Sequence, residues 1–305
     1  MKVILSRKGF DSKSGGFASP ILPNGSMVSL PIPALAGEDQ RITFSDLCLS
    51  KTQSYADVLE KMKRKEVKIT EGKMSTWKPI NEVSLHLDPD LSPTTLERQP
   101  GWRGLFGPSS NWQPHLATKM VHPGDLFLFF GWFEQYMYEG RDDQLIIDLT
   151  DQKSYPNGRH LIFGYLQVGE ILRLDREEQR SRIESWMEYH PHIGNKAKYI
   201  GSEEFPNNAL YIARETVSFE STKKGFGTFA YDLDSAKHLT LTKQGCSRSK
   251  WNLPTFFRET RISCHPEPWR ENYFQSTHRG QEFIIDHNPN VEKWAESLIQ
   301  NFGTT

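Results

Sequence analysis

The sequence contains few cysteines, no long apolar run and almost no net charge. Its three cysteines, Cys48, Cys246 and Cys264, lie far apart among 305 residues. They form no CxxC metal motif and no disulfide framework, which favours a reducing cytoplasm. No apolar run approaches the roughly 20 residues that span a bilayer, and the first residues become polar too soon for a signal peptide. We therefore expect a cytoplasmic protein with no membrane partner.

The formal charge is only −1, so any nucleic acid must be bound by a local basic patch rather than by a global field. Two segments offer such a patch. One is the basic face of a predicted helix, which carries Lys63 and Arg64. The other is a later segment with Arg248, Lys250, Arg258 and Arg261. Either segment fits phosphate contacts, although a solvated surface has the same composition.

The two best-known phosphate-binding motifs are absent, since the early glycines match neither a Walker loop nor a dinucleotide-binding fingerprint. Instead, a short apolar strand leads to Arg7 and Lys8, then to Asp11 and the pair Gly15 and Gly16. Adjacent glycines allow positive φ and a close approach to a ligand, and the cations can bind phosphate. The segment fits a ligand-binding loop, and it also fits a glycine-rich hairpin.

Aromatic and apolar residues are abundant, with 18 Phe, 10 Tyr and 8 Trp. The nearly continuous apolar runs 126–133 and 160–172 predict buried strands in a curved sheet or barrel. Helical spacing of apolar residues predicts helices over 54–68 and 291–301. We expect an α+β fold in which residues 1–305 form a single domain. Its core is a strongly bent mixed sheet, or is barrel-like, and helices flank it.

Three polar residues follow one another at intervals of two: His86, Asp88 and Asp90. On a strand they would share one face, where they could bind a divalent cation or perform acid–base chemistry. The alternative is structural, with Asp88 capping a turn and His86 in the core. His190 and His192 are close in sequence, but no cysteine or carboxylate lies in register with them. We therefore assign no metal ligands.

A polar turn near the end of the chain contains Arg279, Gln281 and Glu282. Gln281 can read a base edge because a carboxamide offers a donor and an acceptor, whereas Arg279 and Glu282 can form an ion pair that supports the turn. Trp102 and Trp132 can stack on an extruded base or belong to the core. Because sites are often built on loops held by a rigid scaffold, we expect this turn, the N-terminal loop and the His86 segment to line one cleft.

The motifs together resemble the third nucleotide-modification-associated domain family of phage and bacterial proteins. The similarity lies in residues 6–21, His86-Leu87-Asp88-Pro89-Asp90, the strands 124–133 and 162–170, and 279–283. The resemblance implies a role in hypermodification of DNA bases. A second, local resemblance is to the β core of PUA-like domains, carried by Gly124-Asp125 and Val168-Gly169-Glu170. Such domains bind RNA or modified bases.

Three functions compete at this point. The first is a transferase-type enzyme that modifies a nucleobase in DNA or in a nucleotide. The second is a PUA-like reader of modified bases, and the third is a metal-dependent nucleotide hydrolase. For the enzyme, the expected catalytic residues are His86, Asp88, Asp11 and Glu282. Substrate binding is assigned to Arg7, Lys8, Gly15, Gly16, Trp102, Trp132, Arg279 and Gln281. The sequence names no cofactor, and the expected partner is a nucleotide or DNA.

Overall fold

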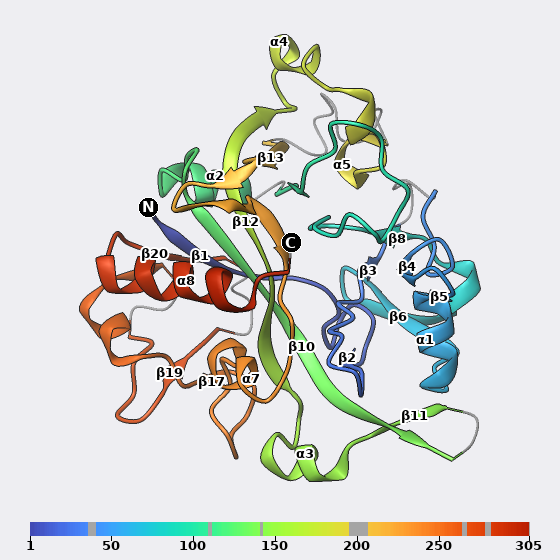
Figure 1. Cartoon of the computed structure of the whole chain (residues 1–305). Coiled ribbons are helices and arrows are strands. Elements are labelled where there is room, and N and C mark those ends of the chain that lie inside the picture. Colours follow the sequence, from blue (N-terminus) through green and yellow to red (C-terminus); the bar gives the residue numbers. More distant parts are fainter. Residues whose placement is uncertain are drawn as a thin grey trace.

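One large mixed sheet organises the computed structural model, which describes residues 1–35, 41–108, 112–140, 143–194, 207–263, 267–277 and 282–304. Its strands follow the order β18 (Ile262–Ser263), β20 (Glu282–Ile285), β1 (Val3–Arg7), β10 (Leu126–Glu139), β12 (Arg159–Arg173), β13 (Ala209–Ala213) and β9 (Leu105–Phe106). Three more strands attach to this path: β2 (Ser19–Ile21), β11 (Gln144–Ile147) and β16 (Phe226–Thr228). In Figure 1, β10 and β12 run side by side through the molecule.

The two long strands confirm the buried runs that the sequence predicts. β10 pairs in parallel with β1 and antiparallel with β12, so the sheet is mixed. The pairing shifts between Phe129 and Phe130 and again between Val168 and Glu170. Gly169 lies in the second shift, where a Cβ would meet the backbone of Arg214 at 2.9 Å. Such bulges bend a strand, as expected for a curved sheet. Among the described residues the sheet stays open, so the expected barrel does not form.

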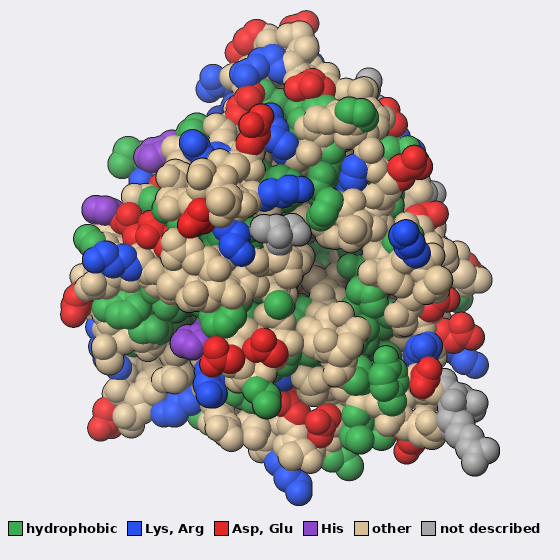
Figure 2. Space-filling view, in the orientation of Figure 1, with side chains coloured by type: hydrophobic (Ala, Val, Ile, Leu, Met, Phe, Trp, Pro, Cys, Tyr) green, Lys and Arg blue, Asp and Glu red, His purple; other side chains and the backbone are tan. Residues whose placement is uncertain are grey.

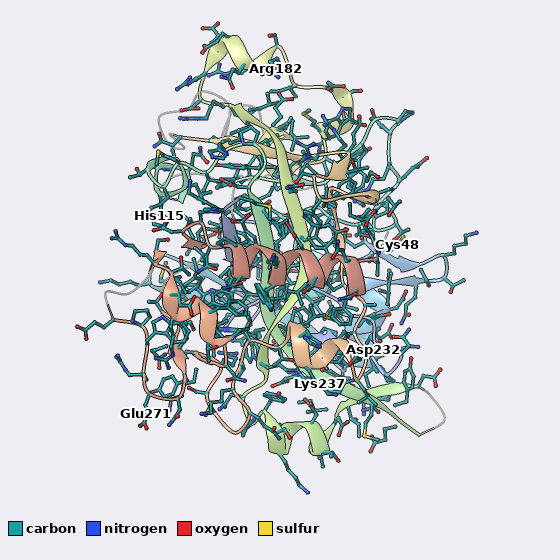
Figure 3. All side chains as sticks on the ribbon, turned by 60° about the vertical axis from the view of Figure 1, so that its left-hand side comes forward. Cys48, His115, Arg182, Asp232, Lys237 and Glu271 are labelled. Atoms are coloured by element: carbon teal, nitrogen blue, oxygen red, sulfur yellow. The ribbon has the colours of Figure 1, made fainter. Side chains whose placement is uncertain are left out.

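The C-terminal helix α8 (Pro289–Phe302) forms as the sequence predicts, with Asn288 as its N-cap. Its buried residues, Val291, Ala295, Leu298 and Ile299, belong to the same core as the central strands. Figure 3 shows the helix lying across β10 and β12. An amphipathic helix buries one stripe in this way, and here the stripe closes one side of the sheet.

The segment after β2 forms a second core beside the sheet. It contains α1 (Tyr55–Lys61), η1 (Ile80–Glu82) and three two-stranded pairs. The pairs are β3 (Ile32–Pro33) with β8 (Leu85–His86), β4 (Cys48–Ser50) with β5 (Gln53–Ser54), and β6 (Glu66–Glu71) with β7 (Met74–Pro79). In Figure 1 these elements gather on the right-hand side.

The helix expected over 54–68 is only half correct. Ser54 caps α1 through a capping box with Asp57, but the helix ends at Lys61, and Lys63 takes a positive φ of 54°. The following residues belong to β6, where burial alternates and Val67 and Ile69 point inward. Apolar residues alternate with polar ones over this segment, which favours a strand over a helix. The basic residues from Lys61 to Lys68 therefore do not share one helix face.

The remaining elements are short. They are α2 (Trp112–Thr118), α3 (Leu149–Ser154), α4 (Glu177–Arg180), η2 (Ser185–Met187), α5 (Pro191–Gly194), β14 (Thr216–Val217), β15 (Glu220–Lys224), α7 (Ser235–Leu239), β17 (Lys250–Trp251), η3 (Thr255–Glu259) and β19 (Phe274–Gln275). None of the described helices is long and apolar enough to cross a membrane. Over the face in Figure 2, cationic and anionic side chains are interspersed.

Candidate metal centre

Three side chains from two distant segments meet beside the sheet. His86 ends β8, Asp88 follows two residues later, and His192 lies in α5. One ligand atom from each residue lies within 4.8 Å of the other two. In Figure 1, β8 and α5 occupy neighbouring positions on the right. The imidazole rings of His86 and His192 are 5.4 Å apart, centre to centre, so the cluster brings together residues more than a hundred positions apart.

His192 is held in one tautomer. Its Nδ1 lies 2.7 Å from Oδ1 of Asn208, and an amide oxygen can only accept, so Nδ1 carries the proton. Nε2 then carries the lone pair that a metal needs. Burial, reinforced by the nearby charge of His190, lowers the pKa of His192 to about 3. The ring is therefore neutral near pH 7, which is the form that binds metals.

Asp88 is oriented by two neighbours. Its Oδ1 accepts a hydrogen bond from the backbone amide of Gly107 at 2.9 Å and lies 3.4 Å from Nε2 of His190. Burial alone would raise the pKa of this carboxyl, but His190, His192 and Lys8 together outweigh burial and lower it below its usual value. Asp88 is thus an ionised carboxylate in a largely buried position.

His190 supports this arrangement from the other side. Its Nδ1 accepts from the backbone amide of His192 at 3.3 Å, so Nε2 carries the proton in the neutral ring. Nε2 is buried without a hydrogen-bond partner among the described residues. Gly107 makes room for both rings, because a Cβ there would lie 2.6 Å from Cε1 of His190 and 2.8 Å from Cγ of His192.

The donor set suits a divalent transition metal. Two imidazoles and one carboxylate occur in catalytic zinc sites and in non-haem iron sites, where three protein ligands leave coordination positions for water or substrate. Two of the three ligands are held by a hydrogen bond from a further group: Asn208 orients His192, and the amide of Gly107 orients Asp88. Such outer partners fix ligand orientation and tune affinity.

Asp90 is not part of the cluster. Both of its carboxylate oxygens contact the guanidinium of Arg98, at 2.6 and 2.7 Å, in a largely buried ion pair. The expectation that His86, Asp88 and Asp90 share a strand face is wrong, because the strand ends at His86. Beyond it the chain no longer alternates, and the third position is taken by His192.

Lys8 and Glu282 form a buried pair next to the cluster. Nζ of Lys8 lies 2.8 Å from Oε1 of Glu282 and 4.4 Å from the ring centre of Phe106. The pairing of Ser6 in β1 with Glu282 in β20 brings these segments together. The other carboxylate oxygen, Oε2 of Glu282, is buried without a partner among the described residues. The positive charge of Lys8 also helps to lower the pKa of Asp88.

Lys8, Asp88 and Glu282 bring one member of each predicted cluster together, whereas other predicted residues lie elsewhere. Arg7, Asp11 and Trp132 line a separate cavity. Trp102 is partly buried and packs under the guanidinium of Arg98, 4.0 Å from its ring centre. Arg279 and Gln281 fall outside the described residues.

Gly15 and Gly16 have a role in packing. Their φ angles are +85° and +88°, and a Cβ on Gly15 would lie 2.1 Å from the ring of Phe10. The amide of Gly15 donates to the carbonyl of Lys68, and that of Gly16 donates to the carbonyl of Asp11. Since both amides are engaged in the backbone, this geometry favours the glycine-rich hairpin over a phosphate loop.

Sequence reasoning missed four residues of the site: Gly107, His190, His192 and Asn208. The two histidines are visible in the sequence as a close pair, but their carboxylate partner comes from about a hundred residues earlier. Only the fold supplies that partner. Gly107 and Asn208 carry no local signal that distinguishes them from ordinary loop residues.

No curated protein and no solved structure matches the chain. A family model described as nucleotide modification associated domain 3 matches residues 2–286, nearly the whole sequence. The match confirms the resemblance that the motifs indicate. It covers β8, both long strands, α5 and β20, and with them every residue of the candidate site. The chain belongs to the nucleotide modification associated domain 3 family.

Proposed function

We propose that this protein is a metal-dependent enzyme of nucleotide modification, with His86, Asp88 and His192 as the ligands of a divalent transition metal. The observation that carries the proposal is the convergence of the three ligand atoms within 4.8 Å. Membership of the family supports a role in nucleotide modification. The proposed metal ligands say which side chains would carry out that role.

A metal held by three protein ligands can polarise a substrate oxygen or lower the pKa of a bound water. The surroundings suit such chemistry, because Asp88 and His192 are largely shielded from solvent. Lys8 and Glu282 add a cation and a carboxylate nearby, and one oxygen of Glu282 has no protein partner among the described residues. We assign to this pair the positioning of substrate or the transfer of a proton.

The same observation favours an enzyme over a reader of modified bases. A reader needs an aromatic pocket and hydrogen bonds to the base, but it does not need ionised ligands with prearranged outer partners. Ordering such groups costs free energy, since each removes a charge or a polar group from water. The cluster of His86, Asp88 and His192 is more easily understood when a bound ion offsets that cost.

The test is metal analysis of the purified full-length protein by mass spectrometry. We expect about one equivalent of a transition metal per chain, and loss of that metal in Asp88→Asn and in His192→Gln. His122→Gln, at an exposed histidine outside the cluster, is the matched control and should keep the metal. A protein that binds no transition metal at neutral pH, even after reconstitution, would contradict the proposal.

The reaction is then identified by nucleoside mass spectrometry. DNA and nucleotide pools from cells that express the protein are compared with those from cells that express Asp88→Asn. A new nucleoside in DNA indicates base modification, and cleaved nucleotides indicate hydrolysis. Identical nucleosides and nucleotides in both samples, with the metal bound, would contradict the enzymatic role.

A further inference from the structure

A second cavity lies at the end of β1, apart from the metal centre. Its volume is about 660 Å³, which is in the range of small-molecule sites. Side chains alternate along an extended strand: Arg7 lines this cavity, whereas Lys8 contacts Glu282 and Phe106. The rest of the lining comes from residues 10–13, Trp132, Asn157, His160, residues 247–249, Ser276 and Thr277.

Arg248 is held in place within this cavity. Its guanidinium lies 3.6 Å from the ring centre of Trp132, a cation–π contact. The indole nitrogen of Trp132 donates to the carbonyl of Asn157 at 3.0 Å, which fixes the ring. Yet Nη1 of Arg248 is buried and has no hydrogen-bond partner among the described residues. A buried donor of this kind calls for a ligand, an ion or a water.

The lining of the cavity carries three cationic side chains, Arg7, Lys13 and Arg248, and one carboxylate, Asp11. Burial lowers the pKa of both Arg7 and Arg248, and the charge of Arg7 lowers the pKa of Arg248 further. The carboxylates of Glu134 and Asp11 act on Arg248 in the opposite direction and more strongly than Arg7 does. Asp11 offsets part of this charge, but its Oδ1 already accepts hydrogen bonds from the amides of Lys13 and Ser14. An anion bound in this cavity would supply an acceptor for Nη1 of Arg248, which has none among the described residues.

Serine and threonine residues add hydroxyl groups to the lining, although the hydroxyl of Ser276 already donates to the carbonyl of Ser249 at 3.1 Å. Ser12, Ser247, Ser249, Ser276 and Thr277 all line the cavity. Arginine guanidinium groups and hydroxyl groups commonly bind phosphate oxygens. A phosphate has more oxygens than a carboxylate and can therefore use more of the donors in this cavity. The Trp132 ring already carries Arg248 on one face. This arrangement makes Trp132 a positioning residue for the cation rather than a platform for a base.

We infer that this cavity binds the phosphate group of a nucleotide, with Arg7 and Arg248 as its charged donors. Its identity as a nucleotide phosphate rests on the proposed function, whereas the preference for a phosphate rests on the cavity itself. The phosphate can belong to a free nucleotide or to single-stranded DNA, since both present the same group. The cavity then anchors the substrate at a place other than the metal.

The test is calorimetric titration of the full-length protein, at low salt, with three probes: thymidine 5′-monophosphate, thymidine and a single-stranded oligothymidylate. We expect at least one phosphorylated probe to bind and thymidine not to bind. Arg248→Gln should weaken that binding by about tenfold or more, because a charge-assisted donor is lost. Lys237→Gln removes a charge from an exposed side chain of α7 that does not line the cavity, and it should leave affinity unchanged.

The probes that bind show whether the cavity is a phosphate site and which substrate it binds. Binding of the monophosphate alone assigns the site to free nucleotides, and binding of the oligonucleotide alone assigns it to DNA. Failure of both probes to bind the folded wild-type protein overturns the inference, as does equal affinity in wild type and Arg248→Gln. If Arg248→Gln does not fold, Arg248→Lys keeps the charge but loses the planar fork, and it must bind more weakly. Metal content, measured in parallel, reports on the proposed function separately.

Discussion

Nδ1 of His192 donates to Oδ1 of Asn208 across 2.7 Å, and both side chains are buried. This one hydrogen bond decides which nitrogen of His192 carries the lone pair and in which direction the ring points. It links α5 to the residue just before β13, a strand of the main sheet. The candidate metal centre is therefore anchored to the sheet through a residue that is not itself one of the three proposed ligands.

The first prediction concerns that anchor. Asn208→Ala should weaken metal affinity by about 10- to 100-fold, the usual cost of losing an outer partner, because His192 loses its fixed tautomer. Asn208→Asp keeps an acceptor and should retain much more of the affinity. Competition with a chelator measures both variants. Equal affinity in Asn208→Ala and wild type would show that the hydrogen bond does not orient a ligand.

The second prediction concerns Gly107. A Cβ there would come within 2.6 Å of His190 and 2.8 Å of His192, so Gly107→Ala should displace both rings. We expect loss of bound metal and a stability loss of about 1–3 kcal/mol, as for other overpacked sites. In Gly72→Ala the added Cβ meets nothing within 4 Å, so this control should keep the metal, although the φ of +59° there costs an Ala some stability. Metal analysis and thermal unfolding test both variants.

The parts of the fold that the sequence predicts correctly are those with a local signal. β10 and β12 are buried on most of their length, so each is a nearly continuous apolar run that can be recognised in isolation. The terminal helix is amphipathic and has an Asn cap, and both features lie within a few residues. Gly169 lies at a bulge, where a side chain would meet the neighbouring backbone.

The candidate site depends on contacts that no local pattern encodes. His86 and Asp88 are singled out by the sequence, but their spacing suggests Asp90 as a third member, whereas the chain turns and Asp90 pairs with Arg98. The residue that lies beside His86 and Asp88 is His192, which follows both long strands in the sequence. Gly15 and Gly16 take the positive φ angles that the sequence suggests. Close packing against Phe10 and Trp77, rather than a ligand, explains why glycine is needed there.

The third prediction concerns pH and Glu134, which lies close to Arg64 and Arg248. Burial raises the pKa of Glu134 above its usual value, although both arginines act in the opposite direction. The folded protein then binds this proton more tightly than the unfolded chain, so stability from this group falls as pH rises through the folded pKa. Glu134→Gln should be more stable than wild type at pH 7 and equal to it at pH 4. Thermal unfolding at both pH values measures the difference.

The same variant tests the phosphate cavity independently. Glu134 raises the pKa of Arg248 and offsets part of its charge. Removing that carboxylate leaves more positive charge facing the cavity, so Glu134→Gln should bind thymidine 5′-monophosphate or oligothymidylate more tightly than wild type. The gain should shrink at high salt, because exposed charges are screened. Weaker binding in this variant would contradict the assignment of Arg248.

The final prediction separates the two aspartates of the His86 segment. Asp88 lies at the candidate metal centre, and Asp90 forms a largely buried ion pair with Arg98. Asp88→Asn should abolish metal binding while it keeps an acceptor for the amide of Gly107. It should also lose some stability at neutral pH, because the folded state lowers the pKa of Asp88 and so favours its ionised form. Asp90→Asn should retain the metal but lose about 3–5 kcal/mol of stability, since it leaves a buried cation without its partner. Metal analysis and denaturant unfolding of the two variants, done side by side, measure both effects. If Asp90→Asn loses the metal while Asp88→Asn keeps it, the carboxylate ligand has been assigned to the wrong aspartate.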